Sequence, residues 1–115
     1  MSYDSGLLQR CLDALEQSGI EGVRHRSVFG MRGLLRSDRM FAAVGETSII
    51  VKLRLEELPA ALRQPGITPF RPDGTTTLGT WVEIADDVIA DDPELRSWLE
   101  AGLRALRPPS SSPSP

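Results

Sequence analysis

The sequence predicts one α+β domain: an antiparallel sheet meander with an N-terminal helix, a short middle helix and a C-terminal helix packed on it. Three observations favour this class. The chain has 115 residues, which suits a single hydrophobic core. Apolar residues recur at helical spacing near both ends. Between these ends lie short β-prone runs whose connections are too short for crossover helices, so the strands should pair antiparallel.

Three segments are expected to be helical. The first is centred on residues 7–15 and stops at Ser18 and Gly19, because glycine tolerates the left-handed conformation that ends many helices. A short middle helix is expected over 56–64. The last runs over 92–106, with Asp92 as its capping residue and Pro93 at its first position.

The strands are expected in the middle of the chain. Gly30 and Gly33 indicate a bend or bulge between the first two. Residues 65–79 have the prolines and glycines of an irregular loop. The expected strands cover 23–29, 34–36, 40–44, 48–53 and 80–84. The domain therefore spans residues 1–107, and the polar Pro/Ser tail over 108–115 is expected to be disordered.

Composition narrows the class of protein. With 40% hydrophobic and 25% charged residues, the chain is typical of a globular protein. No apolar run approaches a membrane span and the N-terminus lacks the features of a signal peptide, so we expect a cytoplasmic protein with no membrane partner. Cys11 is the single cysteine, which excludes an internal disulfide and a multi-cysteine metal site. Its spacing from the leucines predicts a buried small hydrophobe.

Few residues suggest chemistry, and each has a simpler structural interpretation. His25 lies between two arginines without an obvious carboxylate or nucleophile, so it is interpreted as a strand residue. The acidic residues within 86–94 lack calcium-loop spacing and suit capping and solvation. Residues 30–33 do not form a phosphate loop. Trp81 and Trp98 are expected to be core or interface anchors. We therefore expect no catalytic residues, no metal, no cofactor and no enzymatic activity.

The distribution of charged residues suggests a specific candidate site. Residues 24–39 hold five arginines against one aspartate, although the chain as a whole has a net charge of −3. Arg24 and Arg26 are two apart and should share a strand face, while Arg36 and Arg39 flank the predicted turn at residues 37–38. These four arginines are the candidate site for a partner or for nucleic acid.

A set of short motifs resembles a known family. The motifs extend over about residues 5–107: Phe29-Gly30, Leu34-Leu35, residues 40–44 and 49–53, Glu56, Pro65, Pro69-Phe70, Gly74, Gly79, Trp81-Val82 and Trp98-Leu99. In order and spacing they resemble the TfoX N-terminal domain family, also called the Sxy family. The resemblance implies a small α+β domain found in regulators of bacterial DNA-uptake competence, and it brings no catalytic residues.

Two functions remain open at this stage. The first is a non-enzymatic regulatory or protein-interaction module whose partner is another protein or a second copy of the chain, with a dimer as one form. The alternative is a weak nucleic-acid-binding domain that uses the arginine-rich strand face, which a similarity in size and element order to YjbR-type DNA-binding domains favours. The acidic pI of about 5.1 and the single lysine favour the first.

Overall fold

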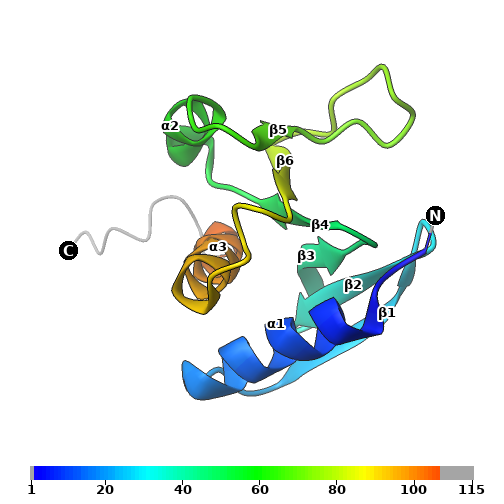
Figure 1. Cartoon of the computed structure of the whole chain (residues 1–115), viewed down its shortest axis with the longest axis vertical. Coiled ribbons are helices and arrows are strands. Elements are labelled where there is room, and N and C mark those ends of the chain that lie inside the picture. The colour runs from blue at the N-terminus through cyan, green and yellow to red at the C-terminus, as the bar shows by residue number, and fades with distance from the viewer. Residues whose placement is uncertain (1, 107–115) are drawn as a thin grey trace.

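The computed structural model describes residues 2–106 and confirms the predicted α+β class (Figure 1). The predicted boundary at residue 107 and the tail after it lie outside the described residues. In chain order, the helices and strands are α1 (Ser5–Gln17), β1 (Val23–Val28), β2 (Met31–Arg36), β3 (Arg39–Val44), β4 (Ser48–Lys52), the 3₁₀ helix η1 (Leu55–Glu57), α2 (Leu58–Leu62), β5 (Ile67–Pro69), β6 (Trp81–Ala85) and α3 (Asp92–Ala105).

The strands form one six-stranded sheet in the order β1-β2-β3-β4-β6-β5, and every neighbouring pair is antiparallel. The meander from β1 to β4 and the pairing of the late strand with it confirm the predicted topology. The prediction of an irregular loop over residues 65–79 was wrong at its start, where β5 forms. This strand is short, ends at Pro69 and depends on pairing with the distant β6, so no local pattern identifies it.

Two-residue turns join the first three strands. The β1–β2 turn consists of Phe29 (φ 53°) and Gly30 (φ 78°), and the β2–β3 turn consists of Ser37 (φ 54°) and Asp38 (φ 62°). Positive φ at both central residues is the type I′ arrangement, whose twist matches that of the flanking strands. The prediction that the first strand includes Phe29 was therefore wrong, because this residue is part of the turn.

The predicted start of the second strand at residue 34 was also wrong. β2 begins at Met31, so Gly33 lies inside the strand rather than in a bend. A Cβ at Gly33 would be 2.6 Å from the Met40 sulfur and 2.9 Å from a Val28 methyl, so glycine leaves room for these neighbours. A register shift does occur nearby, between Leu34 and Leu35, but it lies in the pairing of β2 with β3 and not between the first two strands as predicted.

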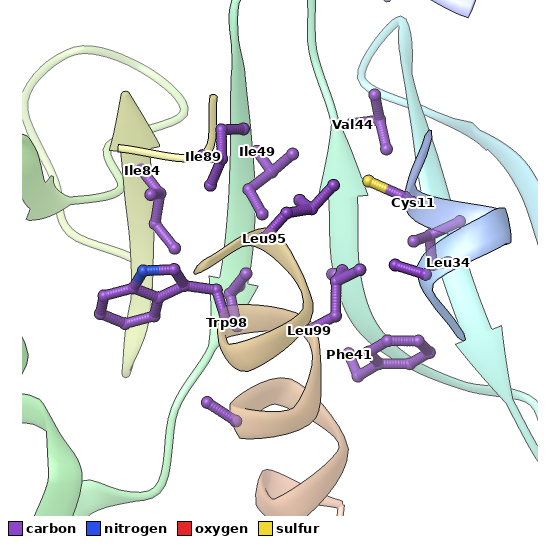
Figure 2. Packing of buried hydrophobic residues seen from close by; sticks show 14 of the residues in the cluster. Cys11, Leu34, Phe41, Val44, Ile49, Ile84, Ile89, Leu95, Trp98 and Leu99 are labelled. Atoms are coloured by element: carbon purple, nitrogen blue, oxygen red, sulfur yellow. The ribbon is translucent and has the colours of Figure 1, made fainter. Parts of the chain in front are cut away.

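The main core lies between one face of the sheet and the helices α1 and α3 (Figure 2). α1 contributes the fully buried Cys11, and α3 contributes Leu95, Trp98 and Leu99. The indole of Trp98 donates a hydrogen bond from Nε1 to the Glu94 carboxylate at 3.1 Å. Trp98 is therefore a core residue whose polar edge is satisfied within its own helix, as its position on an apolar face predicted.

A second apolar cluster lies on the opposite, helix-free face of the sheet. It consists of Met31, Ala43, Ile50 and Phe70, with the half-buried Trp81 packed against them. Ala43 pairs with Ile50 across β3 and β4, while the residues on either side of each project into the main core. Both faces of the sheet are thus apolar at their centre, but helices cover only one.

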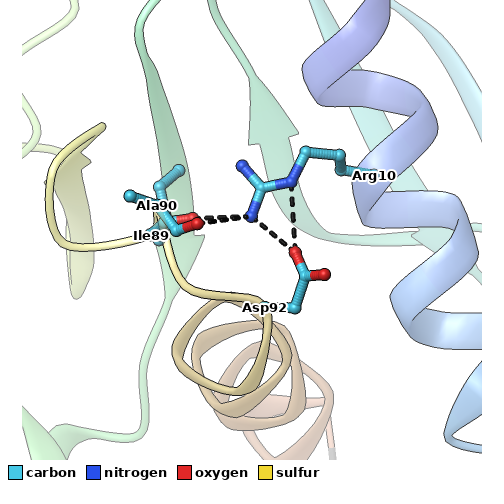
Figure 3. Close-up of polar contacts among 4 residues, drawn as sticks. All are labelled: Arg10, Ile89, Ala90 and Asp92. Atoms are coloured by element: carbon cyan, nitrogen blue, oxygen red, sulfur yellow. Dashed lines mark hydrogen bonds and ion pairs between the residues drawn. The ribbon is translucent and has the colours of Figure 1, made fainter.

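Polar contacts hold α3 at both ends. The prediction that Asp92 caps the helix was wrong: Asp91 occupies the cap position, and no side chain makes a capping hydrogen bond. The Asp92 carboxylate instead accepts hydrogen bonds from Arg10 Nη2 (2.8 Å) and Nε (3.3 Å), and Nη2 also donates to the Ile89 carbonyl (2.8 Å; Figure 3). Arg10 therefore links α1 to the start of α3.

The C-terminal end of α3 has two arginine donors. Arg39 Nη1 donates to the Leu106 carbonyl at 2.6 Å, and Arg54 Nε donates to the Arg104 carbonyl at 3.1 Å. The last carbonyls of a helix have no partner within the helix, and its C-terminal end is the negative end of the dipole. Cations from the sheet side therefore stabilise the end of α3 against the sheet.

The closest approach of α3 to the sheet is at Gly102, and we expect Gly102→Ala to destabilise the fold. A Cβ there would be 2.6 Å from the Phe41 carbonyl oxygen and 3.1 Å from a Val51 methyl, so the helix would have to move away. The expected loss of unfolding free energy is about 1–3 kcal/mol, measured by urea denaturation. Gly6→Ala, the same change at an exposed position of α1, is the control, with an expected change below about 1 kcal/mol. A stabilising Gly102→Ala would contradict this packing.

The burial of Cys11 gives a second prediction. Burial raises the pKa of the Cys11 thiol to about 12 from the ordinary 9.0, so an aromatic disulfide reagent at pH 8 should label the chain only after unfolding in urea. The unfolded thiol ionises near pH 9 and the folded one does not, so the unfolding free energy should fall as pH rises above 9. Cys11→Ala should lack that part of the decline. Stoichiometric labelling of the folded chain would show that Cys11 is accessible.

Candidate interaction surface

The four candidate arginines divide into two pairs on opposite faces of the sheet. Val28 pairs with Met31, a member of the helix-free cluster, so Val28 projects to the helix-free face. Arg26 and Arg24 lie two and four residues before Val28 in the same strand and share that face. Both side chains are exposed, and neither has a hydrogen bond or ion pair with a described residue. This pair is available for a partner.

Arg36 and Arg39 lie on the helix-covered face, beside the end of α3. They flank a cavity of about 520 Å³ whose apolar walls come from Ile20, Leu103 and Leu106. One member of this pair has a structural role, since Arg39 donates to the last described carbonyl of α3. Arg36 is half-buried and has no ion pair among residues 2–106. The structure therefore brings the arginines together two by two, not as one patch of four.

His25 projects from β1 to the side opposite Arg24 and Arg26. Its Nδ1 accepts a hydrogen bond from Arg32 Nε at 3.0 Å, so in this arrangement the ring presents a lone pair to a cation. The Arg32 guanidinium also lies 5.7 Å from the centre of the Tyr3 ring. Among residues 2–106, the described hydrogen bond of His25 is to an arginine, and none joins it to a carboxylate or a hydroxyl group.

The acidic residues before and within α3 have structural partners where their contacts are described. Asp92 binds Arg10, and Glu94 accepts from Trp98. Within residues 2–106, no group of three histidine, cysteine, aspartate or glutamate side chains is placed to hold a metal ion.

A groove between α2 and α3 is a second depression lined in part by charged residues. Its volume is about 380 Å³, and its rim includes Glu56, Glu57 and Glu94. Arg104 donates to Glu57 through Nη2 at 2.7 Å and Nε at 3.2 Å, and these hydrogen bonds lower the pKa of the Glu57 carboxyl. Glu56 forms an ion pair with Arg54 at 3.5 Å, and Glu94 accepts a hydrogen bond from Trp98. All three acids are therefore engaged within the fold, which leaves the groove little free charge for a ligand.

Phe29 is the surface feature that sequence reasoning missed as a site. Its side chain is 61% exposed, and it adopts φ 53° at the tip of the β1–β2 hairpin. An aromatic side chain is unfavourable in the left-handed region, and its exposure to water adds a second unfavourable contribution. The sequence signal was the Phe29-Gly30 pair between two β-prone runs, which we assigned in part to a strand. Phe29 is close in the chain to Arg26 and completes an exposed hairpin that combines cations with an aromatic ring.

No helix in residues 2–106 is long and apolar enough to cross a membrane.

The chain was compared with known proteins and families. A search of curated proteins found no match. Residues 14–106 match the TfoX N-terminal domain, which is not a known family of enzymes. This match begins inside α1 and ends at residue 106, the last described residue, so it includes the whole sheet and α3. The chain therefore belongs to the TfoX N-terminal domain family.

Proposed function

We propose that this chain is a non-enzymatic, cytoplasmic regulatory module of the TfoX type that binds a protein partner. Its binding surface is the β1 hairpin surface, defined as Arg24, Arg26 and Phe29. The competence-regulator role implied by the family resemblance is compatible with such a module, because a regulator of this kind acts by contact with another macromolecule and needs no reaction of its own.

The exposed Phe29 carries the proposal. A residue with both an unfavourable backbone conformation and a large exposed apolar side chain is a candidate for function, because an asparagine in the same turn would avoid both. Aromatic residues are enriched among the few side chains that dominate protein–protein binding energy. Burial of the ring by a partner would recover the apolar contribution that the isolated domain lacks.

Arg24 and Arg26 favour a partner with a negatively charged surface. Arg24 and Arg26 are exposed, lie on one face and have no acidic neighbour in the described ion pairs. Arginine is enriched at protein interfaces, and unpaired cations favour association with an acidic surface. A two-fold dimer centred on this surface would bring the arginine pairs of both copies together, so a different, acidic protein is the better partner.

Nucleic acid is the second candidate because the same arginines could contact phosphates. The placement of Arg36 and Arg39 on the other face reduces the phosphate contacts available to one bound strand. Two contacts correspond to a log–log salt slope of about −1.8 for duplex DNA, which is a weak electrostatic contribution.

We expect Phe29→Asn to stabilise the domain and weaken partner binding. Asparagine tolerates the left-handed turn, so the unfolding free energy should rise by about 1 kcal/mol in urea denaturation. Loss of the ring should remove capture of the partner from a nuclease-treated extract of native cells. Ser37→Asn is the matched control: it relieves the same conformation in the β2–β3 turn, at the other end of β2, and should leave capture unchanged. Equal capture by the wild-type chain and Phe29→Asn would exclude Phe29 from the binding surface.

The arginine pair separates a protein partner from nucleic acid. Arg24→Glu with Arg26→Glu should abolish capture of the protein, whereas binding of duplex DNA at physiological salt should be weak for every variant. Arg63→Glu with Arg71→Glu makes the same charge change at exposed residues that flank β5, at the opposite edge of the sheet, and capture should persist. Tight DNA binding with a steep salt dependence that the first variant flattens would establish the nucleic-acid alternative instead.

A further inference from the structure

β1 is a free edge of the sheet. It has six residues, and each is exposed or half-buried. The opposite edge, β5, has three residues and ends in a proline, which cannot donate a backbone hydrogen bond. Of the two edges, only β1 is long enough to pair with a further strand over several residues.

The hairpin geometry identifies the unpaired backbone groups of β1. In a two-residue hairpin the residues next to the turn, Val28 and Met31, form a hydrogen-bonded pair, and such pairs alternate along the strand. Arg26 and Arg24 therefore bond to β2, whereas the N–H and C=O groups of His25 and Ser27 point away from it. No described backbone hydrogen bond outside the sheet involves these two residues.

Positive charge borders this edge on both faces. Arg24 and Arg26 project to the helix-free face, while Arg32, in the neighbouring strand, lies on the other face with His25. Successive side chains of a strand added beside β1 would point to opposite faces of the sheet. An acidic side chain on either face would therefore lie near an arginine. A second copy of β1 would place arginine beside arginine, which disfavours self-pairing.

We propose, on the basis of the function above, that β1 binds an acidic, extended segment of the partner protein by strand addition. The segment forms backbone hydrogen bonds with His25 and Ser27, its carboxylates lie beside Arg24 and Arg26, and an apolar side chain contacts Phe29 at the end of the strand. Such strand addition uses main-chain hydrogen bonds for affinity and alternate side chains for specificity.

The test uses the full chain and a capped peptide of alternating valine and glutamate. Amide hydrogen exchange followed by NMR is the main readout. In the free protein the His25 and Ser27 amides should exchange quickly, while those of Arg24 and Arg26 should be protected by β2. The peptide should slow exchange at His25 and Ser27 selectively. A peptide of the same sequence with N-methyl groups on alternate amides keeps the charge but cannot pair, and it should bind about tenfold more weakly or not at all.

The second part of the test reverses the charge of the arginine pair and of the peptide. Arg24→Glu with Arg26→Glu should lose the glutamate peptide and gain a matched peptide with lysine in place of glutamate. Arg63→Glu with Arg71→Glu, at two exposed residues that flank β5 at the opposite edge of the sheet, should bind as the wild-type chain does. This exchange keeps the test independent of folding, because a misfolded variant would bind neither peptide and would also lose the protection of its strand amides.

Three results would overturn strand addition: no binding of the glutamate peptide, binding without protection of His25 and Ser27, or equal binding of the N-methylated peptide. None of them bears on the Phe29-dependent capture of a protein from cells, so the proposed function stands or fails by its own experiment. Equal capture by the wild-type chain and Phe29→Asn, together with selective protection by the peptide, would leave the strand site and remove only the role assigned to Phe29.

Discussion

The close packing of α3 against the sheet is the constraint on which the rest of the structure depends. At Gly102 the helix backbone approaches the Phe41 carbonyl so closely that no side chain fits between them. This approach lets Leu95 and Leu99 reach the centre of the sheet, where both are fully buried. α1 packs beside α3 on the same face. Both helices lie on one face of the sheet, and the β1 edge is left to meet solvent or a partner.

The same constraint assigns different roles to the arginines. Arg10, Arg39 and Arg54 donate to carbonyls or carboxylates at the two ends of α3, where they fix the helix in place. Arg24 and Arg26 project from the edge strand β1, outside the strands β3 and β4 on which α3 packs, and have no such acceptor among the described residues. A count of basic residues cannot separate these roles, because they depend on which groups the fold brings within reach.

Helices and strands with strong local patterns could be predicted from the sequence. Elements that form only by pairing with residues distant in the chain could not. α1, β3, β4 and α3 follow from apolar periodicity and from capping and turn residues close to them in the chain. β5 was missed because three residues acquire strand structure only by pairing with β6. The division of the arginines was missed because their faces depend on the register of the first hairpin, and a one-residue shift in a strand reverses every side chain. Placing Phe29 in the strand concealed both the turn and the exposed ring.

The two type I′ turns differ in how well their residues suit the left-handed backbone conformation. At Ser37 and Asp38 the left-handed conformation is held by small polar residues that tolerate it, and the turn requires no explanation beyond chain reversal. At Phe29 the same conformation carries an exposed aromatic ring, next to an edge strand whose outward groups have no described partner. Local conflicts of this kind in an otherwise consistent fold concentrate at functional sites. The unfavourable turn, the open edge and the unpaired arginines coincide in one hairpin, and this coincidence is the physical argument for binding there.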